Sequence, residues 1–233
     1  MTKKQIDLGQ SSNTPRVSII PLVAFVDATE ARKKSIVKDQ KKPHTFKVAP
    51  YATARAVIKK YVQNEFDMEC IISGIDRLHH RRTDSVWARR DAHNSILALH
   101  HFIDSNFPVH LGKVRCSFSK ANIKDFYFYG VSITVAPDLV MRWEENGKRY
   151  VGAVKFRISK EPYSNYSGTL AASSLAYYVR HSVAEQGEIV DNAHCLFCDV
   201  MASTIFSSPE NIEPYMQAVK TACLEYVKLW DAA

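Results

Sequence analysis

The sequence predicts an α/β protein of the α+β type, with a central mixed sheet of about four to five strands flanked by helices. Three features predict this class: a hairpin turning at Asn146-Gly147, a helix-length segment at 167–186, and an apolar run of strand length at 193–206. The continuous apolar run is typical of a strand that is buried on both faces. The hairpin and this strand therefore form the centre of the expected sheet.

The other elements follow from hydrophobic periodicity and from turn residues. In chain order we expect an apolar strand at 15–27 interrupted by Pro21, a helix at 50–65, a helix at 83–107, strand-like sequence throughout 124–138, the hairpin, a helix at 167–186 opening after Gly168 and closing at Gly187, a strand at 193–206 and a helix at 211–231.

The turn at Asn146-Gly147 fixes the register of the hairpin. Both residues tolerate the positive φ of a type I′ turn, so a two-residue loop pairs the residues on either side of it. Counting outward places Val140 opposite Ala153 and Asp138 opposite Lys155, and side-chain alternation puts these four residues on one face. A carboxylate and an ammonium group are thus expected to meet on a small apolar surface. The opposite face carries Leu139, Met141, Trp143, Tyr150, Val154 and Phe156.

The order of Pro137-Asp138, a hairpin and then Ala153-Val154-Lys155 resembles the PD-(D/E)xK nuclease superfamily. In that superfamily the Asp and a following acidic residue bind a divalent metal, usually Mg²⁺, and the Lys positions or activates the attacking water. The resemblance implies catalytic roles for Asp138 and Lys155, with Asp138 as a ligand of Mg²⁺ or Mn²⁺. It also implies a restriction-endonuclease-like core of helix, three antiparallel strands, helix and strand. The acidic position of the motif departs from the pattern, because Ala153 occupies it.

One matched carboxylate makes a weak site for Mg²⁺, which needs oxygen ligands in near-octahedral geometry. Some members of the superfamily move the second acid to a neighbouring element, and the candidates here are Glu185 and Glu188. Glu144 lies roughly 13 Å along the strand from the level of Ala153, too far for a shared coordination sphere. The alternative to a catalytic pair is an ordinary cross-strand salt bridge, worth roughly 0.2–1 kcal/mol.

The net charge of +7 is distributed unevenly along the chain. Residues 31–47 carry six lysines and an arginine, and residues 77–90 carry five arginines and two histidines. Clustered cations are typical of proteins that bind the phosphate backbone of nucleic acid, although a solvated loop and a solvated helix face are the simpler alternative. DNA is favoured over RNA as the partner. The expected phosphate contacts are Lys33, Lys34, Lys41, Lys42, Arg77, Arg81, Arg82, Arg89 and Arg90.

Composition favours a single soluble domain, with 46% hydrophobic and 24% charged residues. We expect a cytoplasmic protein without membrane contact, because no apolar run approaches 18 residues and the polar start lacks a signal core. The five cysteines are scattered and odd in number, so reduced thiols are expected. A zinc site at Cys195-x-x-Cys198 beside His194 would need a second ligand pair, which the neighbouring sequence does not offer.

The resemblance divides the chain into three parts: an arm, basic loop and helical extension at 1–82, a nuclease-like core at 83–206, and a C-terminal helix at 207–233. The N- or C-terminal helices could also form a homodimer. The first functional hypothesis is a nucleic-acid-interacting protein with a degenerate nuclease site, of phage, plasmid or defence origin by analogy. The alternatives are an active Mg²⁺- or Mn²⁺-dependent endonuclease with a relocated acid, and a protein-interaction or inhibitor module that does not bind nucleic acid.

Overall fold

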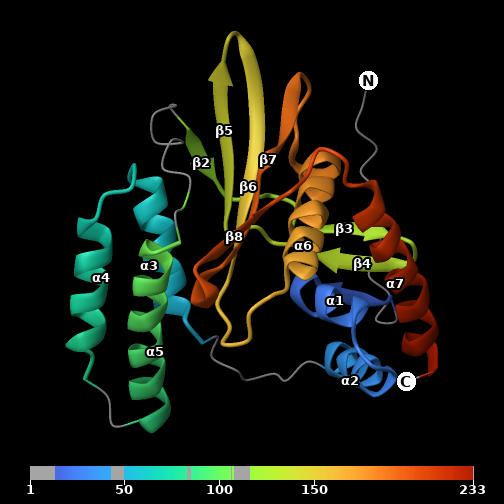
Figure 1. Cartoon of the computed structure of the whole chain (residues 1–233), viewed down its shortest axis with the longest axis horizontal. Coiled ribbons are helices and arrows are strands. Elements are labelled where there is room, and N and C mark those ends of the chain that lie inside the picture. Colours follow the sequence, from blue (N-terminus) through green and yellow to red (C-terminus); the bar gives the residue numbers. More distant parts are fainter. Residues whose placement is uncertain (1–13, 43–49, 83–84, 106, 108–115, 233) are drawn as a thin grey trace.

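A five-stranded mixed sheet forms the centre of the molecule, with helices on both of its faces (Figure 1). The computed structural model describes residues 14–42, 50–82, 85–105, 107 and 116–232. The strands are β1 (Arg16–Ser18), β2 (Ser117–Ser119), β3 (Asp125–Phe128), β4 (Val131–Thr134), β5 (Leu139–Glu145), β6 (Lys148–Arg157), β7 (Glu188–Asp199) and β8 (Thr204–Ser207). The α-helices are α1 (Ile19–Val26), α2 (Glu30–Lys41), α3 (Ala52–Gln63), α4 (Glu69–His79), α5 (Val86–Ile103), α6 (Asn165–Tyr178) and α7 (Glu213–Ala232).

The strand order in the central sheet is β2-β5-β6-β7-β8. β2, β5 and β6 are antiparallel neighbours, α6 crosses over from β6 to β7, and β7 runs parallel to β6 with β8 antiparallel to it. This arrangement confirms the predicted fold class, an α+β protein with a mixed sheet flanked by helices. The strand expected at 124–138 is not part of this sheet, and β2 takes its place beside β5. With β3 and β4 set aside, α5, β2, β5, β6, α6 and β7 follow the order helix, three antiparallel strands, helix and strand.

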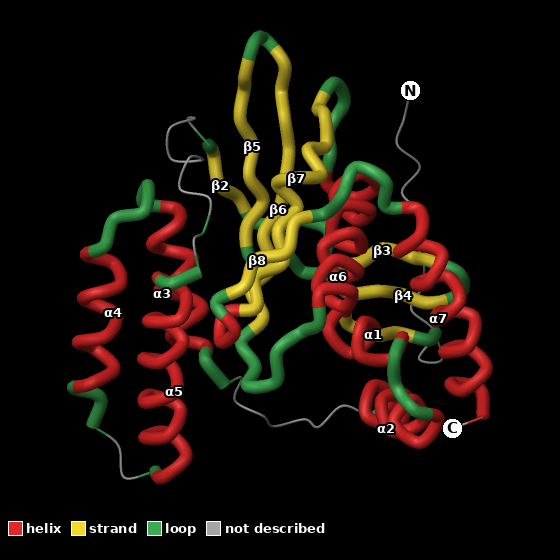
Figure 2. The backbone as a smooth tube through the Cα atoms, in the orientation of Figure 1, coloured by secondary structure: helices red, strands yellow, loops and turns green. Residues whose placement is uncertain are grey.

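The β5–β6 hairpin has the predicted register. Glu145 pairs with Lys148 and Val140 pairs with Ala153. Asn146 and Gly147 have φ values of 51° and 70°, as a type I′ turn requires. The tip of the hairpin projects beyond the surrounding helices (Figure 2).

The central sheet is buried on both faces, and alternation along β5 and β6 separates two apolar clusters. Val140, Val151 and Ala153 belong to the cluster that contains side chains of α1, α6 and α7. Met141 and Phe156 belong to the cluster that contains side chains of α3, α4 and α5. The predicted division of apolar residues between the two faces is therefore confirmed.

Two segments expected to be single strands are divided in the structure. Residues 15–27 form the short strand β1 and then α1, because Pro21 falls in the first helical turn, where a missing N–H costs no hydrogen bond. Residues 124–138 fold back at Tyr129-Gly130, where both φ values are positive. The resulting strands β3 and β4 join β1 in a separate three-stranded sheet.

Three further boundaries differ from the sequence-based expectation. α6 begins at Asn165, before Gly168, because the Ser164 hydroxyl accepts the Ser167 N–H. The apolar run at 193–206 is split between β7 and β8 by a left-handed residue, Ser203. The basic segment expected as a loop is largely the helix α2, which Thr29 caps. Among the described residues, no helix combines the length and hydropathy needed to cross a lipid bilayer.

Candidate functional site

The predicted pair, Asp138 and Lys155, lies where β5 begins and β6 ends. Lys155 Nζ lies 3.9 Å from Asp138 Oδ2, and the two side chains are only 13% and 6% exposed. Lys155 Nζ also donates a hydrogen bond to the carbonyl of Ala136 at 2.7 Å. Asp138 Oδ2 accepts the backbone N–H of Phe156 at 2.9 Å, which holds the carboxylate against the end of the hairpin. The pair is thus more buried and more constrained than an ordinary surface salt bridge.

A third residue, Arg55 of α3, completes this site. Its Nη1 donates to the Phe156 carbonyl at 2.8 Å and lies 3.4 Å from Asp138 Oδ2. Sequence reasoning missed Arg55 because it stands on the flank of an amphipathic helix, 83 residues before Asp138. The sequence pattern holds no signal for so distant a contact.

The electrostatic balance at the site is positive. The pKa of the Lys155 amine is lowered, first by burial; the charge of Asp138 opposes this shift, while Arg55 and Lys59 add to it. Two cationic side chains, Arg55 and Lys155, therefore face one carboxylate, and the charge of Lys59 also acts on Lys155. Such a cluster attracts an anion, and a guanidinium beside an ammonium group is a common combination for phosphate.

These residues do not fit a Mg²⁺ or Mn²⁺ site. The one carboxylate already accepts a backbone N–H and faces two cations. The acidic position of the motif is sealed, because Ala153 is fully buried between Val140 and Cys195, its partners on the neighbouring strands. Among the described residues, no group of three or more His, Cys, Asp or Glu could hold a metal ion.

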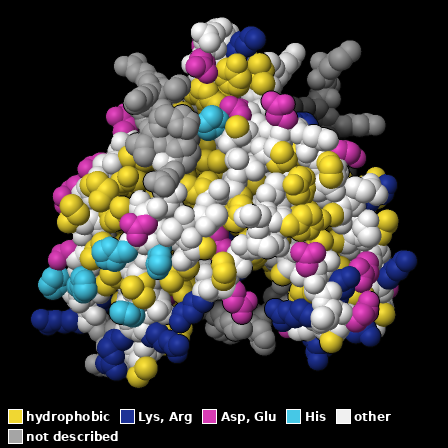
Figure 3. All heavy atoms as spheres, viewed as in Figure 1, with side chains coloured by type: hydrophobic (Ala, Val, Ile, Leu, Met, Phe, Trp, Pro, Cys, Tyr) yellow, Lys and Arg dark blue, Asp and Glu magenta, His cyan; other side chains and the backbone are white. Residues whose placement is uncertain are grey.

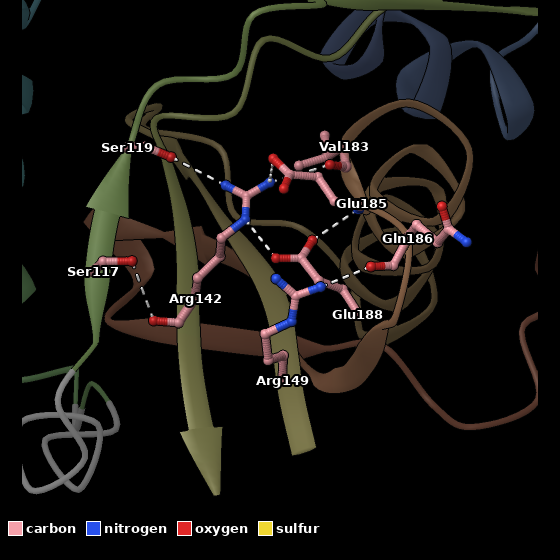
Figure 4. Close-up of polar contacts among 8 residues, drawn as sticks. All are labelled: Ser117, Ser119, Arg142, Arg149, Val183, Glu185, Gln186 and Glu188. Atoms are coloured by element: carbon pink, nitrogen blue, oxygen red, sulfur yellow. Dashed lines mark hydrogen bonds and ion pairs between the residues drawn. The ribbon is translucent and has the colours of Figure 1, made fainter. Parts of the chain in front are cut away.

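The two candidate displaced acids lie elsewhere, around Arg142 of β5 (Figure 4). Arg142 Nε is 2.8 Å from Glu188 Oε1, and its Nη2 is 3.5 Å from Glu185 Oε1. Glu188 pairs in register with Arg149, six residues before Lys155 on β6. That separation is roughly 20 Å along the strand, so the structure does not bring either acid to Asp138.

The predicted phosphate-binding lysines of α2 divide into two groups. Lys33 pairs with Glu225 at 2.7 Å, and Lys41 donates to the Trp230 carbonyl at 2.8 Å. These two lysines tie α2 to α7. Lys34 and Lys42 are exposed and remain available for phosphate.

The predicted arginines lie at the adjoining ends of α4 and α5 and in the segment between them. All five arginines are exposed, and Arg81 also lies 3.8 Å from the buried carboxylate of Asp91. Figure 3 shows Lys and Arg side chains gathered along the lower edge of the molecule, over the α4–α5 end and over α2. Both predicted clusters therefore reach the same edge. The exposed arginines are Arg77, Arg81, Arg82, Arg89 and Arg90.

A second buried ion pair lies at the carboxyl ends of β6 and β7. Arg157 Nη1 donates to Asp199 Oδ2 at 2.8 Å, and the Tyr163 N–H donates to the same oxygen at 2.8 Å. The Arg157 guanidinium also stacks on the Tyr163 ring, 4.0 Å from its centroid. These contacts anchor the segment that follows β6, next to the Asp138 site.

All five cysteines are free thiols, as expected. Cys195 and Cys198 belong to the apolar clusters on opposite faces of the sheet, and burial raises the pKa of the Cys195 thiol to about 12. This arrangement argues against a shared zinc site at the two thiols. No protein-family model matches the chain, and no curated protein matches its sequence.

Proposed function

We propose that this protein is a non-catalytic nucleic-acid-binding protein that holds backbone phosphates at the end of the β5–β6 hairpin. The observation that carries the proposal is the position of Arg55, 3.4 Å from the Asp138 carboxylate and hydrogen-bonded to the strand end. The cationic side chain of Arg55 lies beside Asp138, where a metal site would need further carboxylates. In this proposal the nuclease-like sequence motif no longer supports catalysis, and its lysine, Lys155, contributes to phosphate binding.

Charge and exposure support a phosphate ligand. The Arg55 side chain is 32% exposed, so part of it is open to solvent. The exposed lysines at 34 and 42 and the exposed arginines of the α4–α5 region add further positive charge to the molecular surface. DNA is the preferred partner because the resemblance concerns DNA-cleaving enzymes, and a binding module for protein partners alone is the competing non-enzymatic hypothesis.

An active endonuclease is the second candidate, and two observations favour it. The elements follow the order that the superfamily resemblance implies, and Asp138 meets Lys155. The donor set argues against it, because a metal-dependent mechanism needs ligands that the described residues do not place beside Asp138.

Fluorescence anisotropy with labelled duplex and single-stranded DNA and RNA tests the proposal. About four phosphate contacts should weaken binding roughly a hundredfold between about 50 and about 200 mM salt. The same labelled strands, recovered after incubation with Mg²⁺ or Mn²⁺, should be uncut. Absence of binding at low salt would favour the protein-interaction hypothesis. Metal-dependent cleavage would instead support the endonuclease hypothesis.

A further inference from the structure

A cavity of about 340 Å³ lies beside the Asp138 site, between the starts of α3 and α5 and the segment that follows β6. Its size is near the lower limit for small-ligand pockets, which suits a single planar heterocycle. Six of the residues that line it are Tyr51, Trp87, Arg90, Asp91, Asn94 and Lys160.

Trp87 is the most informative residue of this cavity. Trp87 is 46% exposed, whereas the other two tryptophans, Trp143 and Trp230, are 7% and 3% exposed. Core packing therefore explains Trp143 and Trp230 but not Trp87. An exposed indole in the first turn of a helix, at the wall of a cavity, offers a face on which a nucleobase can stack.

The polar groups of the cavity suit a base attached to phosphate. Arg90 of α5 and Lys160, which follows β6, supply positive charge from two different elements. The Asn94 side chain can both donate and accept hydrogen bonds, as recognition of a base edge requires. The ligand class that this combination fits is a nucleotide.

The carboxylate of Asp91 in the cavity wall has a structural role. Its repulsion of an anionic ligand is reduced by a nearby cation, Arg81. Asp91 Oδ1 accepts the Tyr51 N–H at 2.8 Å, and Oδ2 lies 3.8 Å from Arg81. The first of these bonds holds Tyr51 in a left-handed conformation with φ 60°, at the start of α3. One wall of the cavity is therefore fixed before any ligand enters.

One residue that lines the cavity, Tyr51, is one helical turn from Arg55 of the proposed phosphate site. The Arg55 N–H donates to the Tyr51 carbonyl at 3.0 Å, so the two residues are one turn of α3 apart. One turn is about 5.4 Å along the helix axis. A strand whose phosphate contacts Arg55 can thus reach the cavity with a neighbouring base.

We infer that this cavity binds an unstacked base of a single-stranded nucleic acid, and that Trp87 is the stacking surface. The inference rests on the proposed function and extends it, because it names a single strand as the preferred ligand. A duplex keeps its bases stacked inside, so a duplex would contact the cations without filling the cavity.

The test is a tryptophan-fluorescence and anisotropy titration with a thymidine oligonucleotide, a duplex of equal length, and thymidine monophosphate. The oligonucleotide should quench the emission of the whole protein and bind more tightly than the duplex. Trp87→Ala should lower affinity for the single strand roughly 5- to 100-fold and remove the quenching, while affinity for the duplex changes less than twofold. Trp87→Phe, which keeps a ring, should recover part of the affinity.

Leu97→Ala is the matched control, because Leu97 is also on α5 and 38% exposed but does not line the cavity. Unchanged single-strand affinity in Trp87→Ala, with salt-dependent binding intact, would overturn this inference and leave the proposed function standing. Equal affinity for the monophosphate and the oligonucleotide would overturn the assignment to a strand. No salt-dependent binding of any nucleic acid would instead refute the proposed function itself.

Discussion

Replacing Asp138 with asparagine separates a phosphate site from a metal site. Asparagine has the same shape and can still accept the Phe156 N–H, which Asp138 Oδ2 accepts at 2.9 Å. The substitution removes the negative charge that pairs with Arg55 and Lys155. If these cations bind phosphate, Asp138→Asn should tighten the binding of nucleic acid, because a carboxylate repels the ligand.

The size of the effect follows from distances at the site. A phosphate oxygen about 2.8 Å from Lys155 Nζ would lie at most about 6.7 Å from Asp138 Oδ2, because the pair itself is separated by 3.9 Å. Repulsion between unit charges at that distance is about 0.6 kcal/mol at the dielectric constant of water, and about four times larger at an effective value of 20. The affinity of Asp138→Asn should therefore rise at least about threefold.

Anisotropy at low salt, without divalent metal, measures this change, and thermal unfolding checks that the variant is folded. A folded Asp138→Asn protein that binds tenfold more weakly than wild type would refute the electrostatic reasoning. Cleavage by the wild-type protein that disappears in Asp138→Asn would show that the carboxylate is a metal ligand.

Three further predictions concern the surroundings of the site. Ala153→Glu completes the sequence motif but places a carboxylate at a fully buried position, so we expect the free energy of unfolding in urea to fall by several kcal/mol and no cleavage to appear. A stable variant that cleaves nucleic acid would contradict this. Glu188→Gln breaks the ion pair with Arg142, in which the Glu188 side chain is 3% exposed, and should lower the free energy of unfolding by about 1–3 kcal/mol without changing nucleic-acid affinity. Altered affinity at full stability would instead link Glu188 to the site. Burial raises the pKa of Tyr163 and of Tyr178 to about 12, so the unfolded chain, with tyrosine pKa values near 10, loses these protons first. Stability should therefore fall between about pH 10 and pH 12, and a urea midpoint that stays constant there would refute the raised pKa values.

The hairpin could be predicted in register because its determinants are local. Asn146-Gly147 fixes the turn, and alternation then assigns every side chain of β5 and β6 to a face. The meeting of Asp138 and Lys155 follows from the same counting.

Contacts between distant segments could not be predicted in this way. Arg55 reaches the strand end from α3 because of how that helix packs, and periodicity describes only which face of a helix is apolar. The inaccessibility of Ala153 has the same origin, since its neighbours include residues of α6 and β7. Sequence reasoning therefore identified the pair and the missing acid at Ala153, but not the guanidinium of Arg55 beside the carboxylate.

Local signals also failed where one residue decided between two structures. Pro21 suggested an interrupted strand, yet the same residue is compatible with the first turn of α1. The fold-back at Tyr129-Gly130 lies inside a sequence with strand character on both sides, so only Gly130 indicated that 124–138 forms two strands.

The central claim is that the end of the β5–β6 hairpin is a phosphate site in which Arg55 takes part. Anisotropy in the presence of EDTA, comparing wild type with Arg55→Glu, tests it most directly, and Lys148→Glu at the far end of β6 serves as the control for a reversed charge. We predict that Arg55→Glu lowers affinity at least about tenfold and reduces the salt dependence, while Lys148→Glu changes affinity less than about twofold. Equal affinity of wild type and a folded Arg55→Glu protein would contradict the claim.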